Sequence, residues 1–400
     1  MSKAVQTPIS DKAFCLQIRI GGTSKIKGTK KTVQALKPLQ KEQQVRKQKM
    51  FFIFITIVGM ITLLSGCSQK EEPKLNRYDA QVFELFDTVT SIVGYTEDEE
   101  TFREYANELR DELLVYHQLY DIYHDYEGMA NLKTINDNAG IQPVKVDEKI
   151  IAMLEEAIEM YEKTDGRMNI AMGSVLSLWH DYREAGSLDA DHAAIPSDEE
   201  LQEAAKHMDI YKIKIDREAS TVFLEDPDMS LDVGSVGKGY ATEMVCQNLE
   251  KKGLTSGLIS VGGNVRGIGT KPGGEKWKVG VQNPDLTGDR SYLHTLEIED
   301  MSLVTSGVYQ RFYTVDKKQY HHIIHPDLLM PWDAYASVSI VCQDSGLADC
   351  LSTAVFNMEA QEGLAFIEGL DNVEALWIYQ DGSEMCSSGF KEYVKDEDGQ

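Results

Sequence analysis

The sequence predicts an α+β fold built from mixed, mostly antiparallel sheets with packed helices. A content of 42% hydrophobic and 8% aromatic residues is ordinary for a globular core, and 400 residues suit one large or two medium domains. Segments with strand-like alternation mostly follow one another in adjacent pairs instead of alternating with helices. Adjacent pairs favour antiparallel hairpins over a doubly wound parallel sheet.

Both periodicities are visible in the first half of the region after residue 78. Residues 80–95 alternate well enough for one or two strands, and residues 97–120 carry apolar side chains at helical spacing, which indicates an amphipathic helix. The other elements expected here are helices at 147–163, 172–184 and 198–206, a surface loop at 185–198, and strands at 210–216 and 220–224.

The second half continues the same pattern. A helix is expected at 238–252, and the apolar segment 257–269 is interpreted as one strand in which Gly262 and Gly263 indicate a bulge or a close backbone approach. Asp344 can cap a helix at 345–357. Further elements are expected as strands near 276–282, 292–299, 310–315, 336–342 and 373–379, and as a helix at 363–369.

The charge is unevenly distributed along the chain. The formal net charge is −25, but residues 1–66 contain twelve Lys and Arg against two Asp and Glu. The remaining residues hold 28 basic and 63 acidic side chains, a net charge of −35. Such an acidic body repels nucleic acid, so we expect no nucleic-acid partner.

The N-terminal region looks like a targeting signal. Basic residues at 37–49 precede an uninterrupted apolar run from Met50 to Leu64, which is followed by Ser65, Gly66 and Cys67. A basic segment, a short apolar run and a small-residue cleavage site make a secretory signal, and the run is short for a membrane span. The Leu-Ser-Gly-Cys sequence resembles a bacterial lipobox, which implies cleavage before Cys67 and lipid attachment to it. A plain signal anchor is the alternative.

These observations divide the chain into five segments. Residues 1–44 are a basic, non-globular extension that an over-long gene model would explain. The other four segments are a signal peptide at 45–66, a polar tether at 67–78, a globular region at 79–385 and a charged tail at 386–400.

A glycine-rich turn stands out between Asp232 and Tyr240. An apolar strand leads into Asp232, then into Gly234, Gly237 and Gly239, and then into a helix. A helix N-terminus behind such a turn presents N–H groups to an anion, most often a phosphate. It is not a P-loop, because that motif needs Ser or Thr after the Lys. The alternative is a plain turn between a buried strand and a helix.

Two further segments can carry chemistry. Asp349 and Thr353 are four positions apart on an expected helix, so both oxygens share one face and suit a cation such as Mg²⁺. A cluster that caps the helix start is the alternative. In the run from His321 to His325, one His acting as a proton acceptor is the most economical functional interpretation. Arg311 is a candidate partner for a phosphate or carboxylate.

Taken in order, these segments resemble the FAD:protein FMN transferase family (ApbE) over most of residues 80–380. The matching segments are Phe86 to Thr88, Thr164 to Gly166 with the following Trp179, Asp232 to Tyr240, Gly262 to Asn264, Ser306 to Arg311, His321 to Pro326, and Ala348 to Thr353.

The resemblance implies an ApbE-like, T-fold-related architecture and an activity. Mg²⁺ bridges the pyrophosphate of bound FAD, and FMN is transferred to a Thr or Ser hydroxyl of a target protein with release of AMP. The resemblance also implies an exported lipoprotein on the extracytoplasmic face of the cell membrane. Its acceptor would belong to a membrane redox complex or be another exported flavinylated protein.

The resemblance also implies roles for individual residues. His322 would accept the proton of the incoming hydroxyl, and Mg²⁺ would be held by Asp349, Thr353 and a backbone carbonyl near Ser235. The residues implied to contact FAD are Phe86, Tyr123, Arg167, Met168, Asn169, Asp232, Lys238 and Arg311.

The sequence departs from the family pattern in the histidine run. His325 stands where an Asp is usual, and Leu328 and Leu329 stand where Thr-Gly is usual. Ser352 occupies a place where some relatives carry Asp. Two other functions remain open: a Mg²⁺-dependent FAD pyrophosphatase, in which water replaces the acceptor hydroxyl, and a flavin-binding lipoprotein without catalytic activity.

Overall fold

The computed structural model describes residues 19–20 and 74–395. The elements below belong to one compact unit. The predicted signal peptide at 45–66, Cys67 and most of the tether lie outside the described residues. Within the described ranges, no helix is both long and apolar enough to cross a membrane.

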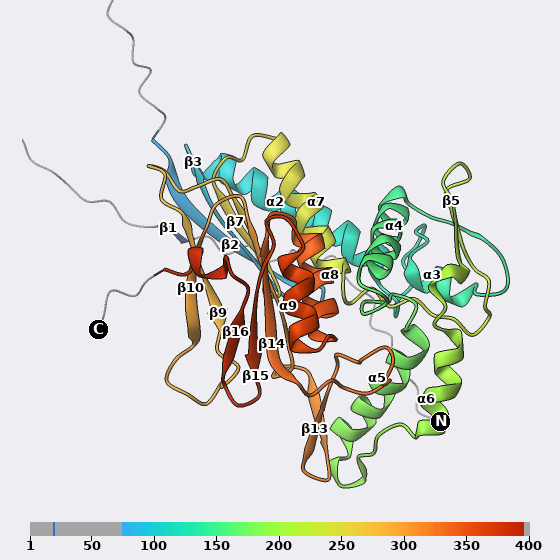
Figure 1. The fold of residues 1–400 in the computed structure, drawn as a ribbon. Helices are drawn as coiled ribbons and strands as arrows, with labels where there is room; N and C mark the ends of the chain where they lie inside the picture. Colours follow the sequence, from blue (N-terminus) through green and yellow to red (C-terminus); the bar gives the residue numbers. More distant parts are fainter. Residues whose placement is uncertain (1–18, 21–73, 396–400) are drawn as a thin grey trace, which may run out of the picture. The chain divides into compact units, whose positions relative to one another are not determined.

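A single large antiparallel sheet forms the centre of this unit. Nine strands belong to it within the described part of the chain, and every neighbouring pair is antiparallel (Figure 1). This confirms the expected α+β class. In spatial order the strands are β1 (Arg19–Ile20), β2 (Asn76–Leu85), β3 (Thr88–Thr96), β7 (Gly257–Val261), β8 (Asn264–Ile268), β11 (Ser302–Gly307), β14 (Tyr335–Cys342), β15 (Glu374–Tyr379) and β16 (Glu384–Cys386).

Helices cover one face of this sheet, and a hairpin covers the other (Figure 1). The β11 neighbours Leu303 and Val304 belong to different apolar clusters, and so do Ile340 and Val341 in β14, because successive side chains of a strand point to opposite faces. Since both faces are covered, all eight residues of β14 are buried. The covering elements are α2 (Glu99–Tyr120), α7 (Gly237–Lys251), α8 (Ser345–Phe356) and α9 (Ala360–Glu368) on one face, and β9 (Trp277–Gln282) with β10 (Tyr292–Ile298) on the other.

The remaining elements come from the middle third of the sequence and from a segment near residue 320. They contribute a third apolar cluster, in which Trp179 packs with Tyr313 and Leu329. They are α3 (Leu132–Asp137), α4 (Glu148–Lys163), α5 (Gly173–Leu188), α6 (Asp198–Ala204), a small sheet of β4 (Val144–Lys145), β6 (Thr221–Leu224) and β5 (Ile213–Asp216), and a hairpin of β12 (Phe312–Val315) and β13 (Lys318–His321).

Three sequence-based boundaries are corrected by the structure. The segment 257–269 is a hairpin of two strands, because Gly262 and Gly263 take positive φ angles of +57° and +96° and form its turn. Helix α5 runs to Leu188, into the expected loop. The tail begins later than residue 386, because Phe390 is buried at 1% exposure and the Lys395 amide donates to the Thr295 carbonyl at 2.9 Å.

Candidate active site

The closest approach of α7 to α8 occurs at Gly239. The Gly239 N–H donates to Oδ2 of Asp349 at 2.8 Å, and Asp349 is only 4% exposed. A methyl group at Gly239 would lie 2.3 Å from the Ser345 carbonyl oxygen and 2.4 Å from Asp349 Cβ. The third glycine of the turn is therefore required by the contact between two helices. Asp349 in turn caps α7, since its carboxylate accepts one of the N–H groups that a helix start leaves unpaired.

Gly239→Ala is expected to destabilise the protein by about 1–3 kcal/mol, the usual cost of overpacking, because rigid backbone blocks the new methyl group. The position of the Asp349 carboxylate should also change, since the new methyl group displaces it. Gly363→Ala in α9 is the matched control, because its nearest neighbour would be the Trp377 ring at 3.3 Å. Thermal unfolding of both variants checks this, and equal melting temperatures would contradict it.

The turn before α7 and helix α8 carry further oxygen donors. The carbonyl of Ser235, one turn before Gly239, receives no hydrogen bond from the residues at 74–395. The hydroxyl of Thr353 lies 3.4 Å from that of Ser306 on β11. A carboxylate, a hydroxyl and an unpaired carbonyl are the oxygen ligands that a hard cation prefers, so these residues fit Mg²⁺.

Ser352, one residue before Thr353, has a different role. Its hydroxyl donates to the Asp349 carbonyl at 2.9 Å and lies 2.7 Å from the Ser306 hydroxyl. It is fully buried. Ser352 therefore fastens α8 to β11 and supports the residues on either side of it.

Charged groups surround Asp232 at the start of the glycine turn. Its Oδ1 accepts the N–H of Gly234 at 2.8 Å. Burial raises the pKa of Asp232, while the Gly234 N–H and the charges of His180, Lys238 and Arg311 act in the opposite direction. Asp232, Lys238 and Arg311 are therefore near enough for their charges to interact, and their contact with FAD stays a prediction. The N–H of Lys238 has no acceptor within residues 74–395, so it is available to an anion.

His322 is held as a neutral imidazole. Its burial and the Arg311 charge lower its pKa from 6.5 to about 3. Its Nδ1 lies 3.2 Å from the Arg311 carbonyl oxygen. Because a carbonyl can only accept a hydrogen bond, Nδ1 must carry the proton, and the lone pair is on Nε2. His322 can therefore accept a proton through Nε2.

This low pKa predicts how pH acts on the enzyme. Because the folded pKa lies below the unfolded value of 6.5, the stability that the neutral ring contributes is complete above pH 6.5 and is lost as pH falls toward 3. Between pH 5 and 8 His322 stays neutral, so kcat should show no acidic limb near pH 6.5 that depends on it. A pH–rate profile of the wild type and of His322→Gln checks this. A limb near 6.5 that disappears in the variant would contradict it.

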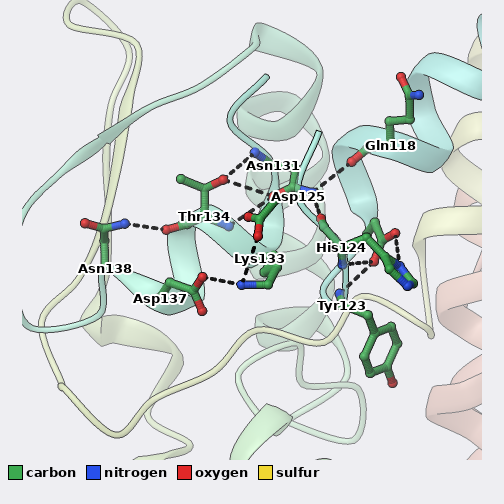
Figure 2. Close-up of polar contacts among 10 residues, drawn as sticks. Gln118, Tyr123, His124, Asp125, Asn131, Lys133, Thr134, Asp137 and Asn138 are labelled. Carbon is green, nitrogen blue, oxygen red and sulfur yellow. Dashed lines mark hydrogen bonds and ion pairs between the residues drawn. The ribbon is translucent and has the colours of Figure 1, made fainter. Parts of the chain in front are cut away.

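Tyr123 lies in a loop after α2 that side-chain hydrogen bonds hold in place (Figure 2). Asp121 accepts the N–H groups of Tyr123 at 2.6 Å and of His124 at 3.1 Å, and the amide of Asn131 donates to the His124 carbonyl at 2.9 Å. The Tyr123 ring is 55% exposed and its centroid lies 5.4 Å from that of His180. Partial burial and the Asp232 charge raise the pKa of Tyr123.

Phe86 lies at the turn of the β2–β3 hairpin. Its φ is +52°, its N–H donates to His117 Nδ1 at 3.2 Å, and its ring meets the His117 ring edge-on at 5.6 Å. This half-buried position leaves part of the ring free for a ligand.

The segment from Arg167 to Asn169 is largely committed to contacts within the protein. Met168 is 1% exposed in the core, and the Asn169 side chain bonds both the Met208 carbonyl at 3.0 Å and the Ala171 N–H at 2.8 Å. These contacts hold the segment in place, and its contact with a flavin stays a prediction. Arg167 pairs with Asp327 at 2.7 Å.

Two residues that depart from the family pattern, His325 and Leu329, form hydrogen bonds that stabilise their loop. His325 Nδ1 accepts the N–H groups of Asp327 at 3.1 Å and Leu328 at 3.3 Å, as a carboxylate would. Leu329, at the usual Gly position, takes a φ of +57°, and its carbonyl accepts from Trp179 Nε1 at 2.9 Å.

A second group of potential ligands lies elsewhere. One ligand atom each from His207, Asp226 and Asp228 fall within 4.8 Å of one another. The ammonium of Lys212 already bonds Asp226 at 2.7 Å, and although burial opposes it, this bond with those of Asp228 and His207 lowers the Asp226 pKa to about 2. We therefore interpret this group as an ion-pair network. It was not predicted from the sequence.

Oxygen donors for a cation, an available helix N-terminus and a neutral His are typical of enzymes that transfer a phosphate-bearing group. Residues 86–377 match the profile of the ApbE family, and the chain belongs to this family. An FAD:protein FMN transferase of Treponema pallidum (strain Nichols) is 34% identical over 278 residues, which cover 66% of this chain and 75% of that protein.

Solved structures agree with this assignment. The crystal structure of an ApbE protein from Thermotoga maritima superposes with a TM-score of 0.71 at 27% identity, over 80% of this chain and 100% of that one. The flavin transferase ApbE from Vibrio cholerae superposes with a TM-score of 0.66 at 23% identity, over 79% of this chain and 99% of that one, and shows the fold alone.

Proposed function

We propose that this chain transfers FMN from FAD to a Thr or Ser hydroxyl of an acceptor protein and releases AMP. The observation that carries the proposal is the donor set of Asp349, Thr353 and the Ser235 carbonyl at the start of α7. The relatives' name, FAD:protein FMN transferase, supports it.

We also propose that Asp349, Thr353 and the Ser235 carbonyl hold Mg²⁺. When bound, Mg²⁺ would neutralise charge on the FAD pyrophosphate, which is the main requirement of phosphoryl transfer. In this proposal the N–H of Lys238 and the Arg311 guanidinium add hydrogen bonds and positive charge. Tyr123 and Phe86 offer aromatic faces for the flavin.

The transfer itself needs one proton acceptor. The acceptor hydroxyl oxygen forms a bond to the phosphorus of the FMN half of FAD, and the bond from that phosphorus to the bridging oxygen breaks. The bridging oxygen leaves with AMP, and His322 Nε2 takes the hydroxyl proton. FMN is then attached through a phosphoester bond.

The purified protein with FAD, Mg²⁺ and a candidate acceptor domain tests the proposal. We expect AMP release together with an acceptor mass increase of one FMN, both lost on adding EDTA. AMP and free FMN beside an unmodified acceptor would favour the pyrophosphatase. Bound FAD without AMP would favour a flavin-binding lipoprotein.

We propose in addition that the mature protein is an exported lipoprotein whose lipid is attached to Cys67. The support is the basic segment, the apolar run and the Leu-Ser-Gly-Cys sequence. The acceptor would then be a subunit of a membrane redox complex or another exported protein on the same side of the membrane.

Cys67→Ser is expected to abolish lipid labelling and to shift the protein from the membrane to the soluble fraction. The reason is that a single residue carries the anchor. Metabolic palmitate labelling and fractionation check this, with Cys386→Ser as the control. Unchanged labelling in the Cys67 variant would contradict the assignment.

A further inference from the structure

A buried carboxylate ties α7 to the first residue of α8. Glu243 is 3% exposed, and its Oε2 accepts the N–H of Ser345 at 3.0 Å and Nε of Arg266 at 3.1 Å. Arg266 comes from β8 and is itself 3% exposed. A single oxygen of Glu243 therefore links α7, α8 and strand β8 of the sheet.

The hydrogen bond between Glu243 and Ser345 is one of two that join α7 to α8. Glu243 lies one helical turn after Gly239, and Ser345 lies one turn before Asp349. The bonds Gly239–Asp349 and Glu243–Ser345 therefore join the two helices at two points that are one turn apart on each. Two such ties fix both the axial position and the rotation of α8 against α7.

The start of α8 depends on this tie. Asp344 accepts the N–H groups of Gly346 at 2.7 Å and Leu347 at 3.0 Å, whereas the buried N–H of Ser345 is satisfied by Glu243. A buried N–H group that loses its acceptor is strongly unfavourable, so loss of Glu243 would displace the start of the helix. Asp349 lies four residues further along this helix.

We infer that Glu243 is a positioning residue for the cation site, because it holds α8 where the Asp349 carboxylate meets the start of α7. This inference rests on the proposed function, since it takes Asp349 and Thr353 as ligands. Glu243 touches neither FAD nor the acceptor in this role.

The competing explanation is charge balance alone. Arg266 is buried and needs a carboxylate, and Glu250 supplies a second one at 3.4 Å. Glu243 and Glu250 both neutralise Arg266, but only Glu243 contacts α8. Glu250→Met is therefore the matched control for Glu243→Met, which leaves the Ser345 N–H without an acceptor. The double variant Glu243→Met with Arg266→Met removes the unpaired charge and still lacks an acceptor for Ser345.

The test measures the affinity for Mn²⁺ by electron paramagnetic resonance, with FAD present and no acceptor protein. We expect Glu243→Met and the double variant to weaken Mn²⁺ binding about 10- to 100-fold, as removal of a group that orients a metal ligand typically does. Glu250→Met should stay within about twofold of the wild type by the same reasoning. Amide hydrogen exchange at the start of α8 should accelerate only in the variants that lack Glu243.

Three results would overturn the inference. Equal weakening in Glu243→Met and Glu250→Met, or wild-type affinity in the double variant, would leave charge balance as the explanation. Unchanged affinity in Glu243→Met, combined with loss in Asp349→Asn, would remove the role of Glu243 and leave the proposed function intact. Unchanged affinity in Asp349→Asn would overturn both.

Discussion

Replacing Asp349 by Asn is expected to lower the rate of FMN transfer roughly a thousandfold while the protein stays folded. Asn keeps an oxygen that can accept the Gly239 N–H, so α7 remains capped. It removes the negative charge that a cation requires, and loss of such a ligand costs several kcal/mol in the barrier, about 4 kcal/mol for a thousandfold change. Measurement of kcat at saturating Mg²⁺, together with thermal unfolding, checks both halves.

Ser352→Ala is the control for this prediction. Ser352 lies on the same helix and is equally buried, but its hydroxyl bonds the Asp349 carbonyl and Ser306. Its loss should cost about 1 kcal/mol of stability, the usual contribution of a hydrogen bond, with a much smaller effect on kcat. Transfer by Asp349→Asn within tenfold of the wild-type rate would contradict the cation assignment.

Asp349 links the fold to the proposed chemistry. One carboxylate oxygen caps α7, and the other has no hydrogen bond from residues 74–395. The helix contact that creates this arrangement requires Gly239, which leaves room for Asp349 Cβ. A substitution at either position therefore acts on stability and activity together, and only Asn at 349 separates them.

Much of the fold could be predicted from the sequence because its strands form local hairpins. β2 and β3 are neighbours in sequence and in the sheet, and the same holds for β9 with β10. Period-2 alternation and helical spacing therefore locate most elements. The order β3–β7 and β8–β11 could not be predicted, because long segments separate these strands and alternation carries no information on partners.

The candidate site, like the fold, could be predicted from the sequence only in part. The motifs that contain Asp232, His322 and Asp349 are recognisable in the sequence, since each combines unusual residue types at fixed spacing. The partners of Gly239 and Glu243 could not be predicted, because they lie 110 and 102 residues away. A lone Glu among the apolar positions of α7 was the only signal, and such a residue is normally a solvated one.

The conformations of residues that depart from the family pattern could not be predicted from the sequence either. His325 imitates a carboxylate by accepting two backbone N–H groups, and Leu329 takes a positive φ that Gly would adopt more readily. The packing of Trp179 against this loop holds Leu329 in place. Tertiary contacts thus compensate for residues that local preference disfavours.

His322→Gln is expected to lower the rate of FMN transfer about 10²- to 10⁴-fold, the usual contribution of a general base, while FAD binding is retained. The amide of Gln can still donate to the Arg311 carbonyl, but its oxygen is far too weak a base to take a proton. His321→Gln is the matched control, because His321 is 5% exposed and its Nδ1 accepts the Ile323 N–H at 3.2 Å. That change should lower the melting temperature and leave kcat of the folded enzyme nearly unchanged. Single-turnover transfer with saturating FAD distinguishes the two variants, and equal rate losses would show that the neutral His322 is structural and that another group takes the proton.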